Sequence, residues 1–260
     1  MITSIVKKSL YKLIGKNLTA KVHGLWFLYL TKSKPLPDPE LEYISTFNLQ
    51  GTIAIDVGAN GANWTKGLSS LVEKSGRVIA FEAHPYYFKA SAAAISYSNI
   101  MKHNTTIHPC ALSDNESTIS LAIKENGKDL DGQSRVILNN QNNDALSIVK
   151  VDSYRLDKFL KTISLNNRKI SIIKLDVEGH ESHVIRGAIE TIKGHSPILI
   201  CEFNSDEAGR LCFEEIRDEL SPLGYNFYIT DGKNLEYFNE VTQLDSHISR
   251  NVICMKQINL

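Results

Sequence analysis

The segment that decides the fold is TIAIDVGANG, residues 52–61. Its first part, residues 52–57, is apolar apart from its first residue and Asp56, which is typical of a strand buried on both faces of a parallel sheet. The turn that follows carries Gly58 and Gly61, where the backbone can bend sharply and approach a ligand closely. A helical pattern begins directly afterwards. Strand, glycine turn and helix therefore follow one another as in the first unit of an α/β fold.

The rest of the chain repeats this alternation. Apolar runs predict strands at residues 77–82, 105–112, 170–177, 197–203, 225–230 and 251–256, and helix-length stretches lie at 63–74, 86–99, 182–193 and 206–220. We therefore predict a doubly wound, mostly parallel sheet that is closed by an antiparallel strand. The polar stretch 124–146 interrupts the alternation and is predicted to be an insertion or loop.

Composition limits the classes of function. With 260 residues, 42% of them hydrophobic and 22% charged, the chain has ordinary globular composition. Its 29 basic and 29 acidic residues balance, whereas a dedicated nucleic-acid binder is usually basic, so we expect no nucleic-acid partner. The four cysteines stand far apart, which predicts buried free thiols and a cytoplasmic location.

Charge is unevenly distributed along the chain. Residues 1–37 contain seven lysines and no acid, so the remainder holds 22 basic and 29 acidic residues. Apolar residues recur at helical spacing in this basic segment, which predicts an amphipathic helical arm. The arm could pack on the body or on a second subunit of a homo-oligomer, or it could contact an anionic membrane surface or a lipid-linked substrate. The proline-rich linker at residues 34–40 places the boundary of the main domain, residues 38–260, after residue 37.

Ligands of a doubly wound sheet bind beyond the carboxyl ends of its strands, so the residues there are the candidates for a site. The glycine turn after the first strand and Glu82 at the end of the second, where a carboxylate can accept both hydroxyls of a ribose, indicate an adenosine-type cofactor. A dinucleotide fingerprint would need glycines where Asn60 and Asn63 stand. Asp56 would also repel a pyrophosphate, whereas it suits the cationic end of S-adenosylmethionine. A nicotinamide-dependent oxidoreductase and a non-catalytic module that keeps the fold remain as alternatives.

Several motifs follow one another along the chain: DVGANGANWT at residues 56–65, FEAHP at 81–85, ALSD at 111–114, LD at 156–157 and KLDVEGHE at 174–181, followed by Gly187. In this order they resemble the FkbM-type methyltransferases. The resemblance covers about residues 52–204. Ala83 stands where the family usually has a proline.

The resemblance implies a Rossmann-like class I methyltransferase that uses S-adenosylmethionine and methylates a hydroxyl of a sugar, glycan or natural product. By motif, the residues around the methionine part and the ribose would be Asp56, Gly58, Asn60 and Gly61, with Thr65 in the same motif. Glu82 would hold the ribose diol. The segment Ala111, Leu112 and Ser113 would lie against the adenine.

The segment after the fourth predicted strand supplies the candidates for catalysis. A hydroxyl is a poor nucleophile unless a positioned base takes its proton. Asp176 is the first candidate for that base, followed by Glu178 and then His180. Acids at the start of a helix also stabilise it through its dipole, which is an alternative role for Glu178. Ligand-type residues cluster here, but their order is not that of a zinc protease, so we assign no metal.

Overall fold

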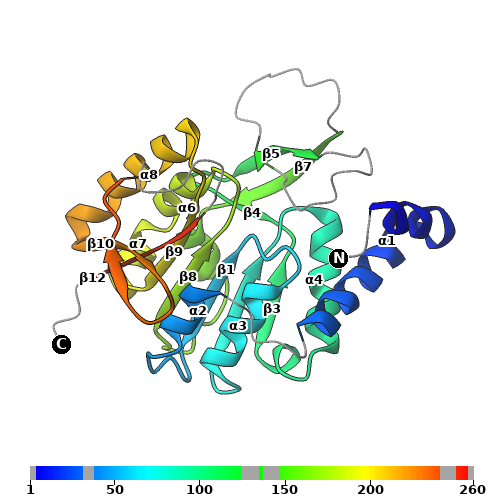
Figure 1. The fold of residues 1–260 in the computed structure, drawn as a ribbon, viewed down its shortest axis with the longest axis horizontal. Coiled ribbons are helices and arrows are strands. Elements are labelled where there is room, and N and C mark those ends of the chain that lie inside the picture. The colour runs from blue at the N-terminus through cyan, green and yellow to red at the C-terminus, as the bar shows by residue number, and fades with distance from the viewer. Residues whose placement is uncertain (1–3, 32–37, 124–134, 137–146, 241–249, 257–260) are drawn as a thin grey trace.

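The computed structural model describes residues 4–31, 38–123, 135–136, 147–240 and 250–256 (Figure 1). Within these residues, a central sheet of eight strands has the order β11-β10-β12-β9-β8-β1-β2-β3. The strands of this sheet are β1 (Ile53–Val57), β2 (Arg77–Phe81), β3 (Thr105–His108), β8 (Ile170–Leu175), β9 (Ile198–Phe203), β10 (Tyr225–Thr230), β11 (Leu235–Tyr237) and β12 (Arg250–Lys256).

The topology is the predicted doubly wound one. From β1 the chain moves outward through β2 to β3, and it then returns to the other side of β1 to build β8 and β9, all in parallel. The last strand, β12, pairs antiparallel with both β9 and β10, so it is the predicted closing strand. The chain therefore reverses its direction of travel between β1 and β8, and a ligand site is expected at that place.

Helices cover both faces of the sheet because the strands are apolar on both sides. On one face Ala54, Val78 and Ile172 pack with α2 (Pro39–Ile44) and α3 (Asn63–Val72), and α4 (Pro85–Tyr97) continues this layer over β3. The opposite face packs on α5 (Leu156–Phe159), α6 (Glu181–Gly187), α7 (Ile189–His195) and α8 (Glu207–Leu220).

One predicted helix is two helices in the structure. The stretch 182–193 divides into α6 and α7 at Ala188, which has non-helical backbone angles. The carboxylate of Asp157 accepts hydrogen bonds from the backbone N–H groups of Glu190 and Thr191 at 3.1 and 2.8 Å, and thereby caps the first turn of α7. The cap comes from a distant segment, so a local pattern cannot reveal it.

A second sheet was not predicted. It has the order β4-β7-β5-β6 and consists of β4 (Ala111–Leu112), β5 (Ser117–Ile123), β6 (Arg135–Val136) and β7 (Ser147–Tyr154). The predicted strand 105–112 is divided by Pro109, which has no N–H to donate, so β3 ends before it and β4 joins the other sheet. Of the predicted polar loop 124–146, only β6 is described, and the remainder lies outside the described residues.

The basic arm forms α1 (Ser4–Leu30), which bends at Gly15, where φ is 75° and ψ is 161°. It lies against α4 at the edge of the molecule beyond β3 (Figure 1). The contact uses small and polar residues, because Ala20 and Gly24 are buried there, whereas the predicted apolar stripe, which includes Leu18 and Leu25, faces outward. Most of the proline-rich linker lies outside the described residues. No helix among those described is long and apolar enough to cross a bilayer.

Gly24 sets the distance between α1 and α4. A Cβ atom at Gly24 would stand 1.9 Å from the carbonyl oxygen of Ala90, whereas a Cβ at Gly194, in α7, would meet nothing within 4 Å. We expect Gly24→Ala to lower the free energy of unfolding by about 1–3 kcal/mol, because the helices must move apart. The matched variant Gly194→Ala is expected to leave it unchanged or raise it slightly. Denaturant unfolding of both variants checks this, and equal values would contradict the packing described.

Candidate active site

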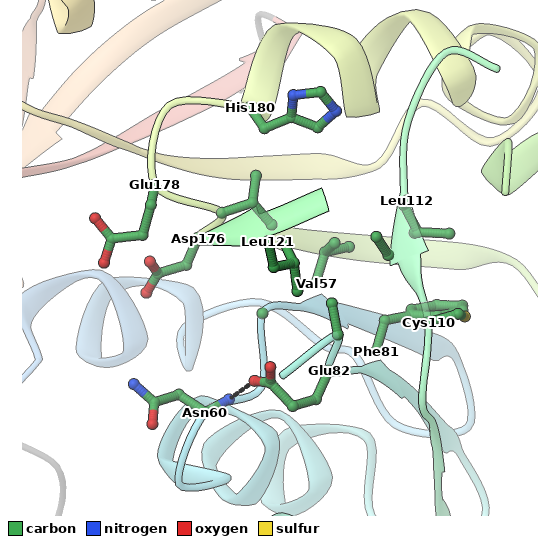
Figure 2. A pocket seen from close by; sticks show the side chains of 14 residues that line it. Val57, Asn60, Phe81, Glu82, Cys110, Leu112, Leu121, Asp176, Glu178 and His180 are labelled. Atoms are coloured by element: carbon green, nitrogen blue, oxygen red, sulfur yellow. Dashed lines mark hydrogen bonds between the residues drawn. The ribbon is translucent and has the colours of Figure 1, made fainter. Parts of the chain in front are cut away.

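A cavity opens at the carboxyl ends of the central strands, at the place where the chain reverses direction (Figure 2). Its walls come from the segments that follow β1, β2, β3 and β8, with one residue from β5. The lining residues are Val57, Gly58, Asn60, Phe81, Glu82, Ala83, Cys110, Ala111, Leu112, Leu121, Asp176, Val177, Glu178 and His180. Most of the sequence-predicted site residues are therefore brought together around one space, although they are up to about 120 positions apart in the chain.

Gly58 joins two walls of the cavity. Its φ is 91°, which favours glycine, and a Cβ atom there would lie 1.9 Å from the carbonyl oxygen of Asp176. The backbone N–H of Asp176 also donates to the carbonyl oxygen of Val57 at 3.0 Å. The turn after β1 is thus held directly against the turn after β8.

Both turns contain residues in the left-handed region of backbone angles. Asn60 and Ala62 have φ of 44° and 62° after β1, and Glu178 and Gly179 have φ of 56° and 94° after β8. Such angles cost on the order of 1 kcal/mol for a non-glycine residue and persist only when surrounding contacts impose them. They occur here in the two segments that face the cavity, as is common at functional sites.

Glu82 directly follows β2 at the edge of the cavity. Its two carboxylate oxygens accept hydrogen bonds from the backbone N–H groups of Asn60 and His84, both at 2.7 Å. Figure 2 shows the bond to Asn60. Burial raises the pKa of Glu82 to about 7, although these two donors oppose the shift. The carboxylate is fixed in position and keeps lone pairs with which it can accept from a ligand.

Asp56 and Thr65 do not line the cavity. Asp56 is buried in the sheet, and the Thr65 hydroxyl donates to its Oδ2 at 2.5 Å. The Oδ1 atom of Asp56 is buried and has no hydrogen-bond partner. Burial raises the pKa of this carboxyl to about 6. These two residues, expected around the cofactor, lie behind the glycine turn, where they support it.

Lys174 is a site residue that the sequence analysis did not identify. It is 1% exposed, and the strand register places it beside Asp56 on the neighbouring strand β1. Its ammonium lies 3.6 Å from Oδ2 of Asp176 and 5.3 Å from the centre of the Trp64 ring. Burial alone would lower the pKa of Lys174, but the carboxylates of Asp176, Glu202 and Asp56 outweigh it and raise this pKa. A lysine within the apolar run ISIIKL, two positions before Asp176, is the signal that could have indicated it.

The three candidates for catalysis all line the cavity. The carboxylates of Asp176 and Glu178 lie on the same side of it, and the His180 ring points away from them (Figure 2). The Asp176 side chain is 34% exposed, so it is accessible from the cavity.

His180 is held as a neutral ring. Its Nε2 lies 2.9 Å from the Ser113 hydroxyl, and the ring stacks on His183 at 4.4 Å between centroids. Burial, with help from His183, lowers the pKa of His180 to about 4. The other ring nitrogen, Nδ1, is buried and has no hydrogen-bond partner.

Of the remaining predicted residues, some line the cavity and others contact the residues or segments that form its walls. Ala111 and Leu112 line the cavity, but Ser113 does not, because its hydroxyl contacts His180. Gly61 does not line it either, and a Cβ at Gly61 would stand 2.9 Å from the ring of Phe27 on α1. The basic arm therefore contacts the glycine turn, which was not expected from the sequence.

A second cavity, of about 390 Å³, adjoins the first and shares Glu178 with it. It lies between the segments that follow β8 and β9, and its polar lining consists of carboxylates and one amide: Glu178, Glu181, Glu202, Asn204 and Asp206. In the part of the chain that the structure describes, no three histidine, cysteine or acidic residues are grouped closely enough to hold a metal ion.

Comparison with known proteins decides the family. A sequence model described as the methyltransferase FkbM domain matches residues 56–227. The chain belongs to the FkbM methyltransferase family. It is therefore an S-adenosylmethionine-dependent methyltransferase, which confirms the resemblance stated above and excludes the oxidoreductase alternative. Among curated proteins, none is significantly similar in sequence.

Solved structures agree on the fold. An FkbM methyltransferase from Methylobacillus flagellatus shares 15% sequence identity at a TM-score of 0.52; the match covers 95% of this chain but only 60% of that one. A protein provisionally named an rRNA methylase, from Clostridium thermocellum, shares 13% identity at a TM-score of 0.52 over 85% of this chain and 94% of that one. An O-methyltransferase from Bacillus cereus in complex with SAH shares 10% identity at a TM-score of 0.48 over 97% of each chain.

The buried ammonium of Lys174 generates a prediction about stability. In Lys174→Met the neighbouring carboxylates lose their counter-charge, which costs about 3–5 kcal/mol of unfolding free energy when they are ionised. The pKa of Asp56, which burial already raises, rises further without this ammonium, so the folded state holds more protons and the loss of unfolding free energy grows with pH. We expect a larger loss at about pH 8 than at about pH 5 in denaturant unfolding. The exposed Lys233→Met is the control, and similar small losses in both variants would contradict this role.

Proposed function

We propose that this methyltransferase transfers the methyl group of S-adenosylmethionine to a hydroxyl oxygen of a sugar, glycan or natural product. The observation that supports it is the position of Asp176, a partly exposed carboxylate that lines the cavity of the glycine turn. Its neighbour Glu178 borders both this cavity and the carboxylate-lined second cavity. A base at this position can serve an acceptor that enters from one side and a donor that binds on the other.

The residues around the first cavity fit the methyl donor. Gly58 lines the cavity with backbone alone, so a ligand can approach the turn after β1 closely, and Glu82 offers a fixed carboxylate for the two ribose hydroxyls. Ala111 and Leu112 offer an apolar wall for the adenine. The buried, unpartnered Nδ1 of His180 offers one further polar contact. When bound, the donor supplies an electrophilic methyl group on a positively charged sulfur.

In the proposed mechanism, Asp176 takes the proton of the acceptor hydroxyl as the new oxygen–carbon bond forms. The ammonium of Lys174 lies 3.6 Å from Oδ2 of Asp176 and fixes the position of this carboxylate. Glu178 is the second candidate for the base, and it borders both cavities. His180 orients its neighbours in this account, because its pKa near 4 leaves the ring neutral and weakly basic.

The second cavity supports a polyhydroxylated acceptor. Carboxylate and amide oxygens accept hydrogen bonds from hydroxyl groups, and several of them line the same space. The same negative charge would repel phosphates, so nucleic acid is a poor candidate.

Transfer of labelled methyl groups to a panel of free sugars, glycosides and hydroxylated natural products tests the proposal, with transfer RNA and a protein lysine substrate as comparisons. Labelling confined to RNA or amine acceptors would refute it.

Removal of the base separates binding from chemistry. We expect Asp176→Asn to bind S-adenosylhomocysteine within about twofold of the wild type and to lose about 100-fold or more in turnover with the acceptor that the panel identifies. Asp218→Asn, on the exposed surface of α8, is the matched control and should behave as the wild type. Isothermal calorimetry and initial rates measure the two quantities, and an Asp176→Asn enzyme with full turnover would exclude this base.

The raised pKa of Glu82 predicts the pH dependence of cofactor binding. Its ionised form is the better acceptor for ribose hydroxyls, and the pKa of about 7 means that this form increases from a minor to a major population between about pH 6 and about pH 8. Affinity for S-adenosylhomocysteine should therefore rise about tenfold over this interval and then level off.

Glu82→Gln should remove this pH dependence, because the amide does not titrate, and should weaken binding at about pH 8. Glu236→Gln, an exposed substitution on β11, should retain the wild-type profile. Calorimetric titrations across the pH range measure both, and an unchanged profile in Glu82→Gln would rule out the assigned role.

A further inference from the structure

The helix α1 has two faces of different character between Leu18 and Tyr29. The inner face, which contacts α4, buries the small or polar residues Thr19, Ala20, His23 and Gly24, and Leu28 also packs on α4. The outer face presents apolar side chains at helical spacing, Leu18, Leu25 and Tyr29, which are 49%, 38% and 67% exposed. The apolar stripe is thus on the surface, although folding normally buries such a stripe.

Specific contacts fix the orientation of this face. The Tyr86 hydroxyl lies 3.2 Å from Nδ1 of His23, and the ammonium of Lys66, on α3, donates to the carbonyl oxygen of Thr31 at 2.6 Å. Gly24 allows the closest approach to α4. The inner face is therefore held against α3 and α4. If α1 rotated to bury its outer residues, these contacts would break.

The charge of the same segment indicates the chemistry of what covers this face. Seven lysines and no acid occur in residues 1–37, whereas the remainder of the chain carries an excess of seven acidic residues. An exposed apolar stripe combined with segregated positive charge suits a partner that is apolar and anionic at once. Trp26 borders the stripe and stacks on Tyr29 within it, and such aromatic residues favour the interface between lipid headgroups and water.

We propose that α1 docks this methyltransferase on the surface of an anionic lipid membrane, with the outer face in the headgroup region and the lysines beside acidic lipids. A symmetric contact with a second copy fits less well, because it would bring the two sets of seven lysines together. Docking in this orientation also places the glycine turn near the bilayer, since Phe27 of the same helix contacts Gly61. The proposal does not depend on which acceptor the enzyme methylates.

Sedimentation of the full chain with vesicles tests this proposal. Vesicles of phosphatidylcholine with about 30% phosphatidylserine are compared with vesicles of phosphatidylcholine alone, at low salt and at about 0.5 M salt. We expect binding to the anionic vesicles, reduced by salt, and little binding to the neutral ones. Sedimentation that does not differ between the two lipid compositions would overturn the proposal.

Two sets of variants assign the binding to α1. The outer-face variant Leu18→Ser/Leu25→Ser/Tyr29→Ser should weaken binding about tenfold or more while keeping the thermal stability of the wild type. The charge variant Lys7→Gln/Lys8→Gln/Lys12→Gln should weaken it roughly fivefold for each lysine that lies near the membrane. The control is Leu211→Ser/Tyr237→Ser, which removes similarly exposed apolar side chains from α8 and from β11, the edge strand opposite β3, and should bind as the wild type.

The same variants distinguish a protein partner from lipid. If the wild type is a dimer without lipid and the outer-face variant is a monomer, a second copy covers the face and the proposal is wrong. Equal sedimentation of the wild type and the outer-face variant would also overturn it. Light scattering of both proteins in the absence of vesicles provides the first of these measurements.

Discussion

The site depends on one backbone contact, the approach of the Gly58 α-carbon to the carbonyl oxygen of Asp176. No side chain fits between them, and the N–H of Asp176 donates to Val57 in the same place. The contact joins the turns that follow two neighbouring strands, which are far apart in the sequence. On the other side of the cavity, the Glu82 carboxylate accepts a hydrogen bond from the backbone N–H of Asn60. The cavity therefore has rigid walls before any ligand binds, which reduces the entropy that binding must overcome.

The ammonium of Lys174 offsets the negative charge that this arrangement brings together. Parallel strands bring Asp56, Asp176 and Glu202 to one end of the sheet, and burial favours the protonated form of Asp56. A single buried ammonium offsets their charge and lies against the ring of Trp64. It also lies 3.6 Å from Asp176 in the wall of the first cavity, where the proposed chemistry requires a charged carboxylate.

The sequence predicts the features that local patterns encode and misses those that arise from contact between distant segments. Buried strands such as β1 and β8, the glycine turn and the acids after the strands follow from periodicity and position in a doubly wound sheet. The role of Lys174 depends on carboxylates from neighbouring strands, and the break between α6 and α7 depends on Asp157. The stripe on α1 was recognised, but only packing shows that it faces outward, because Gly24 makes the opposite face the better fit to α4.

The central claim is that the cavity between Glu82 and Asp176 binds the methyl donor. A crystal structure of the protein with S-adenosylhomocysteine tests it most directly. The account predicts that both ribose hydroxyls lie within hydrogen-bonding distance of the Glu82 carboxylate, the adenine lies along Ala111 and Leu112, and the sulfur faces Asp176. A nucleoside bound elsewhere, or bound here with its ribose turned away from Glu82, would contradict it.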